Sequence, residues 1–200
     1  NKKKIYKKFR KFDAEIFISN ENKYKSLFNK VDYIINCIGL IKPDTINNTR
    51  KAIEINSLFP HVLNNFIKNK CLIFQIKTDC VFSGHSKVPY LENCDHDALD
   101  VYGKSKSLGE VSSNKFINIR TSIIGPEPSK HYKSLFEWFI AQKSNINGFT
   151  NHYWNGITTY DFARVVSLFI KKGITKSKDF HISYVKKTNK YDLLNNINKI

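Results

Sequence analysis

The sequence predicts an α/β fold built on a parallel sheet, and its apolar pattern carries this prediction. Apolar runs at 31–39, 72–78 and 116–124 have the length and content of strands. Helical stretches separate them, because 52–68 carries an apolar stripe at helical spacing and 100–111 is typical of a second helix. Alternation of strands with helices favours βαβ units with right-handed crossovers.

Local patterns predict the elements of the first half. Residues 14–19 (AEIFIS) are typical of a short strand, and 22–29 of a short helix. The run at 31–39 is continuously apolar and closes on glycine, which indicates a strand buried on both faces. Within 52–68, Pro60 implies a kink or a new helix start, because proline lacks an amide hydrogen and clashes with the preceding turn.

The second half begins after the strand at 72–78. Residues 79–99 are rich in polar side chains, so we expect a long loop, and loops of that length in compact domains are usually functional. The strand at 116–124 should stop at Gly125-Pro126. Beyond it we expect a helix, an irregular stretch, an amphipathic helix and a short strand, at 132–141, 147–157, 161–172 and 180–183 respectively.

Composition bounds the class of protein. Two hundred residues with 41% apolar content suit one domain, or one with a small appendage. No apolar run approaches the ~20 residues that cross a bilayer, so we expect no membrane partner. The net charge of +16 comes from scattered lysines, which predicts no nucleic-acid partner and only a general attraction for anionic ligands. Because the chain begins at Asn1 and contains no Met, we expect that upstream sequence has been lost.

The cysteines at 37, 71, 80 and 94 form no Cys-x-x-Cys pair. A zinc site needs closely spaced ligand pairs, so no metal is expected. Cys37 and Cys71 lie in apolar, strand-like surroundings, which predicts buried free thiols in a reducing cytoplasm.

The predicted strands end in polar or glycine-bearing clusters at 36–39, 78–79 and 120–122. Ligands of parallel α/β sheets bind beyond the carboxyl ends of the strands, so these clusters mark the expected site. Nearby, Tyr102 and Lys106 stand four residues apart, which on a helix places them on one face. An ammonium beside a phenol stabilises the phenolate and lowers the pKa of the tyrosine, and such a pair can exchange a proton with an alcohol or carbonyl.

Seven motifs in order resemble the extended short-chain dehydrogenase/reductase family, and within it the dTDP-4-dehydrorhamnose reductases and related sugar-nucleotide reductases. The resemblance spans roughly residues 31–163. The motifs are Asn36-Cys-Ile-Gly39, Ile55-Asn56, Thr78-Asp-Cys-Val-Phe-Ser-Gly84, Pro89-Tyr-Leu-Glu92, Tyr102-Gly-Lys-Ser-Lys-Ser-Leu-Gly-Glu110, Ile119-Arg-Thr-Ser122 and Gly156-Ile-Thr-Thr-Tyr-Asp-Phe-Ala163.

The resemblance implies a Rossmann-like fold, with a dinucleotide-binding domain over 1–125 and a smaller, partly interleaved substrate lobe over 126–200. It implies NADPH or NADH as cofactor, a nucleotide-sugar substrate, a cytoplasmic location and an assembly compatible with a homodimer. Tyr102 would be the acid, with Lys106 tuning it and Thr78 orienting the substrate oxygen. The implied cofactor contacts are Cys37, Ile38, Gly39, Tyr102 and Lys106, and the implied substrate contacts are Thr78, Asp79 and Ile123.

The chain departs from the family pattern in two places. The glycine-rich turn that cradles the cofactor pyrophosphate is absent from these residues, and Ile123 stands where rhamnose reductases carry an aromatic side chain. A nucleotide-sugar epimerase or dehydratase and a non-catalytic dinucleotide-binding regulator remain alternatives. Asn56 is equally compatible with an active-site role and an ordinary helix position, Asp79 also suits a turn cap, and Trp154 favours core packing over a sugar platform. His152 and Asn155 belong to the substrate region, whereas nothing in the pattern makes His85 or His96 ligands.

Overall fold

A computed structural model describes residues 11–68, 70–127, 134–174 and 179–199. Its main sheet has four parallel strands in the order β1-β2-β3-β7. The strands of this sheet are β1 (Tyr33–Asn36), β2 (Leu72–Lys77), β3 (Phe116–Arg120) and β7 (Phe180–His181). Two short pairs lie outside it: β4 (Ile123–Ile124) with β6 (Ile157–Thr158), and β5 (Tyr153–Trp154) with β8 (Thr188–Asn189).

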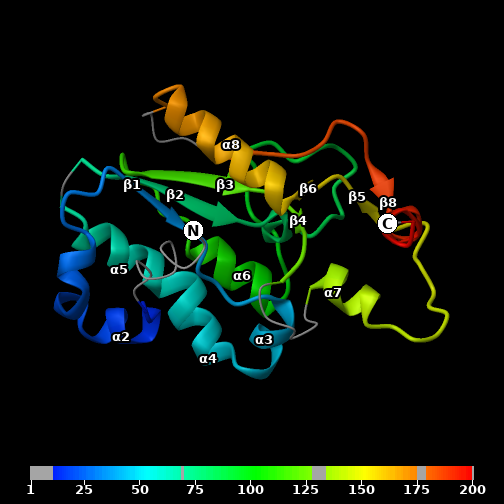
Figure 1. The fold of residues 1–200 in the computed structure, drawn as a ribbon, viewed down its shortest axis with the longest axis horizontal. Helices are drawn as coiled ribbons and strands as arrows, with labels where there is room; N and C mark the ends of the chain where they lie inside the picture. Colours follow the sequence, from blue (N-terminus) through cyan, green and yellow to red (C-terminus); the bar gives the residue numbers. More distant parts are fainter. Residues whose placement is uncertain (1–10, 69, 128–133, 175–178, 200) are drawn as a thin grey trace, which may run out of the picture.

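Helices cover the sheet in two layers (Figure 1). On one face lie α2 (Ala14–Ser19), the 3₁₀ helix η1 (Glu21–Leu27), α3 (Lys42–Asn47), α4 (Thr49–Ala52), the π-helical segment η2 (Ile53–Leu58), α5 (Phe59–Phe66) and α6 (Val101–Leu108). On the other face lies α8 (Thr159–Lys171). The remaining helices are η3 (Asp79–Val81), α7 (Leu135–Ile140) and α9 (Lys190–Ile197). This arrangement confirms the predicted Rossmann-like α/β fold.

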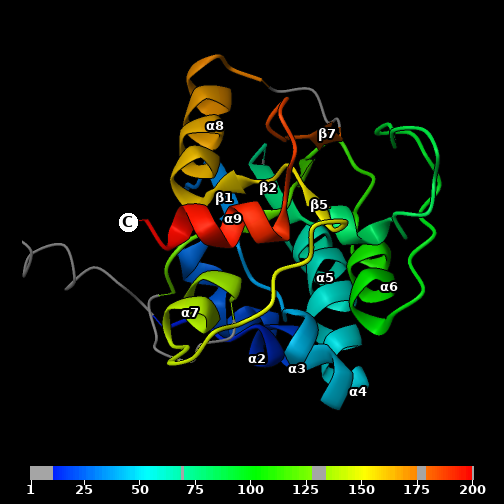
Figure 2. The ribbon, with the colours of Figure 1, turned by 90° about the vertical axis from the view of Figure 1, so that its right-hand side faces the viewer.

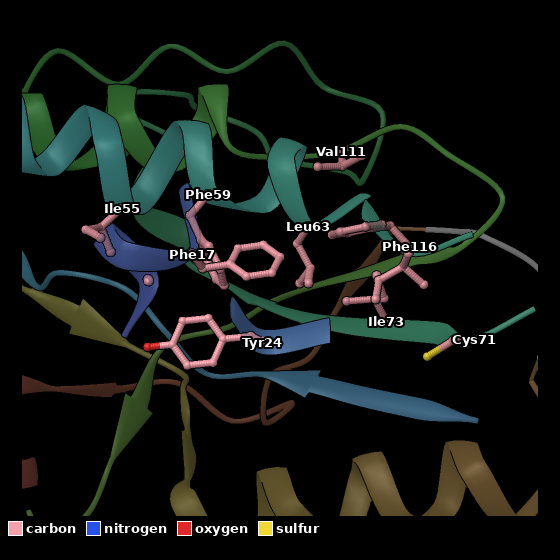
Figure 3. Close-up of a cluster of buried hydrophobic side chains, with 11 residues drawn as sticks. Phe17, Tyr24, Ile55, Phe59, Leu63, Cys71, Ile73, Val111 and Phe116 are labelled. Atoms are coloured by element: carbon pink, nitrogen blue, oxygen red, sulfur yellow. The ribbon is translucent and has the colours of Figure 1, made fainter. Parts of the chain in front are cut away.

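Each face of the sheet has its own apolar core. Between the sheet and α5, buried side chains such as Phe17, Phe59, Leu63 and Phe116 pack together (Figure 3). A second cluster packs β2 and β3 against α8, and it contains Phe74, Ile117, Ile119, Ile157, Phe162 and Val166. Strand alternation explains the division, because successive residues of β2 and β3 face opposite layers.

The helical run from Thr49 to Phe66 confirms the prediction made from its apolar stripe. Pro60 stands in the first turn of α5, directly after the π-helical segment η2. Proline is tolerated in a first turn because its missing amide hydrogen would have had no partner there. Pro60 therefore marks a new helical segment within one continuous run.

The strand predicted at 14–19 is wrong, because these residues form α2. The Asp13 carboxylate caps the helix by accepting from the amides of Glu15 (3.0 Å) and Ile16 (3.2 Å). Ala14 and Phe17, three residues apart, are the buried positions. The helix expected at 22–29 is the 3₁₀ helix η1.

The prediction that the first main strand is buried on both faces is also wrong. Strand β1 spans four residues, and Tyr33 and Ile35 are 39% and 48% exposed. Both side chains lie on the same face of the sheet as α8. Because α8 packs over β2 and β3 (Figure 1), it leaves this side of β1 exposed. Along the chain as described, β1 is the edge of the sheet.

The C-terminal third returns to the main sheet through β7, while β5, β8 and α9 stand beside the carboxyl ends of the strands (Figure 2). The strand predicted at 116–124 divides, since β3 ends at Arg120 and β4 pairs with β6 instead. The helices predicted at 132–141 and 161–172 correspond to α7 and α8, although 132 and 133 lie outside the described residues. In the part of the chain that the structure describes, no helix is long and apolar enough to cross a membrane.

Candidate active site

Helix α6 holds Tyr102 against the residues that follow β2. The helix begins after Asp100, whose carboxylate accepts from the Gly103 amide at 2.8 Å. A Cβ on Gly103 would lie 2.3 Å from the carbonyl oxygen of Cys80, so only glycine allows α6 to approach η3 this closely. The first turn of α6, which carries Tyr102, is thereby fixed beside the end of β2, as the motif predicts.

Thr78 and Tyr102 meet at this contact. Burial raises the pKa of Tyr102 to about 12, while a side-chain hydrogen bond with Thr78 acts in the opposite direction. The Thr78 hydroxyl also accepts from the Cys80 amide at 3.2 Å, which caps η3 and fixes the side chain. At neutral pH the phenol therefore keeps its proton and can act as an acid.

Lys106 lies one helical turn from Tyr102, with Nζ 5.9 Å from the centroid of the Tyr102 ring. Its side chain is buried, and burial lowers its pKa to about 8. The pKa of Tyr102 lies above its usual value and not below it as expected, because burial of the phenol is the largest effect in this structure. That Lys106 tunes this pKa stays a prediction.

The Lys106 ammonium points at the chain after β1. A Cβ on Gly39 would lie 2.1 Å from Nζ, so a side chain at position 39 would displace the ammonium from this place. Within the described ranges, Nζ of Lys106 has no hydrogen-bond acceptor and no ion-pair partner. An ammonium without a protein partner, at the end of a largely buried side chain, suits a ligand that supplies hydroxyl or phosphate oxygens.

Asn56 forms hydrogen bonds with the backbone of Leu40, the residue after Gly39. Its Oδ1 accepts from the Leu40 amide at 2.8 Å, and its Nδ2 donates to the Leu40 carbonyl (3.2 Å) and to Ser105 Oγ (3.1 Å). Asn56 therefore joins the segment after β1 to α6 and does not line the cleft described below. Cys37 is exposed, so the prediction that it is buried is wrong, whereas Cys71 is buried. Cys37 follows β1, which is the edge strand among the described residues.

A cleft of about 770 Å³ opens at the residues that follow β2 and β3, and Thr78, Tyr102 and Lys106 are not among the residues that line it. Asp79 lines it and accepts from Ser122 Oγ at 3.2 Å, which joins the ends of β2 and β3 as the strand-end rule predicts. His85, His152 and Asn155 also face the cleft. Ile123 is not among the lining residues and pairs with Ile157 instead.

Trp154 packs against the backbone of Gly156, where a Cβ would lie 2.4 Å from its ring, in line with a packing role. His96 bonds Ser107 Oγ at 2.8 Å and does not line the cleft. Arg120 lines the cleft, as the strand-end cluster at 120–122 predicts, whereas sequence reasoning missed His181. His181 stands at the carboxyl end of a parallel strand, so the rule that selected Arg120 could have found it.

A further polar group lies under α6. Lys77 is buried, its Nζ donates to the Lys106 carbonyl at 3.0 Å, and burial lowers its pKa to about 7. Among the described residues, no cluster of three or more His, Cys, Asp or Glu side chains could hold a metal ion.

Solved structures share this fold. A dTDP-4-dehydrorhamnose reductase from Clostridium acetobutylicum is 23% identical, covers 92% of this chain and 68% of its own, and has a TM-score of 0.76. A hypothetical reductase of the same name from Sulfolobus tokodaii is 24% identical, with coverages of 95% and 68% and a TM-score of 0.76. The Bacillus anthracis reductase, in complex with NADP, is 20% identical, with coverages of 94% and 70% and a TM-score of 0.78.

At these identities the likeness establishes the fold alone. No curated protein sequence matches the chain. The family described as the RmlD substrate binding domain matches residues 6–199, which is nearly the whole chain. The chain therefore belongs to the RmlD substrate binding domain family.

Proposed function

We propose that this chain supplies the proton donor and the substrate cleft of an NAD(P)H-dependent oxidoreductase that reduces a 4-keto nucleotide sugar. One observation carries the proposal: Tyr102 is hydrogen-bonded to Thr78 at the carboxyl end of β2 and has Lys106 one helical turn away, with Asp79 and Asp100, next to Thr78 and near Tyr102 in the chain, lining a cleft of about 770 Å³. Membership of the RmlD substrate binding domain family and the fold shared with dTDP-4-dehydrorhamnose reductases support it.

In this proposal Tyr102 donates a proton to the substrate oxygen. Its pKa of about 12 keeps the phenol protonated at neutral pH, so the acid form is the one present when substrate binds. The hydroxyl of Thr78 orients the same oxygen and stabilises the charge that develops on it. General acids of this kind contribute about 10²–10⁴ in rate.

Lys106 and the segment Cys37–Gly39 would hold the cofactor, NADPH or NADH. The unpartnered ammonium of Lys106 beside Gly39 fits the hydroxyl groups of a ribose, and the exposed Cys37 and Ile38 offer contact area next to it. The Bacillus anthracis relative in complex with NADP supports this choice. The reduced nicotinamide, when bound, supplies the hydride.

Asp79 is the proposed substrate contact among the cleft residues, because its carboxylate can accept from sugar hydroxyls. Ile123 is proposed as a second contact from its position in the motif alone, and a homodimer and the division near residue 125 likewise remain predictions.

The test is steady-state oxidation of NADPH or NADH by the full-length protein with a 4-keto nucleotide sugar. Net oxidation that depends on the sugar and falls in Tyr102→Phe supports the proposal. An epimerase or dehydratase returns the hydride, so conversion of the sugar without net oxidation would favour that alternative. Cofactor binding without any turnover would favour a regulatory protein.

A further inference from the structure

Arg120 lies at the end of β3, is only 4% exposed and faces the layer that contains α6. A guanidinium has five N–H donors in a rigid planar fork and no acceptor. All five of these donors have partners here. Because every N–H group of this buried guanidinium has a partner, the surrounding residues hold Arg120 in one defined position.

The partners come from three separate segments. Nε and Nη2 form a fork on the Glu110 carboxylate at 2.8 Å and 2.5 Å, just after α6 ends. Nη2 also donates to Asp179 Oδ2 at 2.8 Å, next to β7. Nη1 donates to the Glu92 carbonyl at 2.9 Å and to His181 Nε2 at 3.1 Å. The Arg120 side chain thus joins the end of α6, the loop at residues 79–99 and strand β7.

The loop is held a second time through His181, because its backbone amide donates to Glu92 Oε1 at 3.1 Å. Since arginine can only donate, Nε2 of His181 must accept, and its imidazole is therefore unprotonated at that nitrogen. Phe82 completes this side of the cleft, with its ring stacked on Tyr90 at 4.3 Å and edge-on to His181 at 5.6 Å.

These residues form a wall of the cleft. Arg120, His181, Phe82 and Tyr90 all line it, and Glu92 lies two residues beyond Tyr90. Among the described hydrogen bonds, none joins Arg120 to Thr78 or Tyr102, so we expect Arg120 to act through the elements that it joins.

We propose that Arg120 is a positioning residue that fixes this wall relative to α6 and thereby sets the affinity of the cleft for its nucleotide sugar. The inference rests on the proposed reductase function for the identity of the ligand. Substitution should weaken substrate binding and leave the proton donor in place. A fork that joins two carboxylates is also not reproduced by lysine, which offers a single ammonium.

The experiment compares Arg120→Lys with the wild-type full-length protein. Arg164→Lys, on an exposed stretch of α8, is the matched control. We expect KM for the 4-keto nucleotide sugar to rise about tenfold or more, with kcat within about twofold. Amide exchange at 89–97 and 180–183 should accelerate by about tenfold without substrate, because the loop and strand lose their common anchor.

Asp179→Asn is a milder variant, because it weakens only the ion pair between Arg120 and Asp179, whose carboxylate is partly exposed. It can be measured if Arg120→Lys does not fold. Guanidinium ion added to Arg120→Ala should restore part of the substrate affinity. Equal losses in kcat and kcat/KM, or unchanged exchange in both segments, would overturn the proposal. The exchange measurement needs no turnover, so it decides the role of Arg120 even if the wild type reduces no nucleotide sugar.

Discussion

The ammonium of Lys106 occupies the space where a side chain on Gly39 would begin, with Nζ 2.1 Å from the position of a Cβ on residue 39. This contact links the chain after β1 to the helix of Tyr102, and a side chain at position 39 would displace the ammonium.

Gly39→Ala should therefore impair function more than folding. The added methyl displaces the flexible end of Lys106, and a misplacement near 1 Å at a catalytic group can cost on the order of 10²-fold in activity. Measurement of kcat/KM and of the Kd for NADPH should show losses, with a melting temperature close to the wild type. Gly173→Ala is the control, because nothing lies within 4 Å of its Cβ but its φ of +62° strains the backbone, so it should lower stability by about 1 kcal/mol and spare activity. The reverse pattern would refute this account of Gly39.

Tyr102→Phe should reduce kcat by about 10²–10⁴ and leave the fold intact. Phenylalanine keeps the buried ring and removes only the proton donor. Steady-state kinetics with a 4-keto nucleotide sugar measure the effect, and Tyr160→Phe, on the exposed start of α8, serves as control. Near-normal turnover in Tyr102→Phe would show that the proton comes from another group.

Lys77 should make the stability of the protein depend on pH. Its pKa is about 7 in the folded state and about 10.5 when unfolded, so between these values the unfolded chain binds a proton that the folded chain has released. The free energy of unfolding should therefore rise with pH across this window, and Lys106 should add to the rise above about pH 8. Each unit of pKa difference corresponds to about 1.4 kcal/mol.

Urea unfolding from pH 6.5 to 10 measures this rise. Lys77→Met should flatten the profile markedly and raise stability near neutral pH, because the uncharged side chain carries no desolvation cost. Lys104→Met, which removes an exposed lysine from the same helix as Lys106, controls for the loss of one positive charge. An identical slope in Lys77→Met and wild type would rule out Lys77 as the source.

Asn56→Leu should destabilise the protein by about 1–3 kcal/mol for each backbone group of Leu40 that it leaves unpaired. The substitution roughly keeps the volume of the side chain but removes the acceptor and the donor that bond the amide and carbonyl of Leu40. Chemical denaturation measures the loss, and the exposed Asn195→Leu provides the comparison. A stability equal to that of wild type would mean that water replaces the lost bonds.

The sequence predicts those elements of the fold whose local pattern has a single structural explanation. Strands β2 and β3 are buried on both faces, so a continuous apolar run identifies them. The strand prediction for residues 14–19 fails because six residues are too few to separate the alternation of a strand from the spacing of a helix. The Asp13 cap stabilises the helix. Cys37 is exposed because burial beside an edge strand depends on which helix covers it, and local sequence does not contain that information.

The candidate site divides in the same way. Tyr102, Lys106 and Thr78 belong to compact motifs, and the contacts of Tyr102 with Thr78 and Lys106 follow from one helix lying beside the end of one strand. The role of Arg120 could not be predicted, because Asp179 is 59 residues away and Glu92 is 28 residues away along the chain. Such contacts depend on the register of β3 with β7, which two residue pairs define.

The uncovered side of β1 has a consequence for handling the protein. No described strand pairs with its outer edge, and Tyr33 and Ile35 present apolar surface there. An edge of this kind is a template for strand addition between molecules. The outer edge of β1 can therefore accept a further strand, from the same protein or from a second molecule, and a charged residue at position 35 should weaken that pairing.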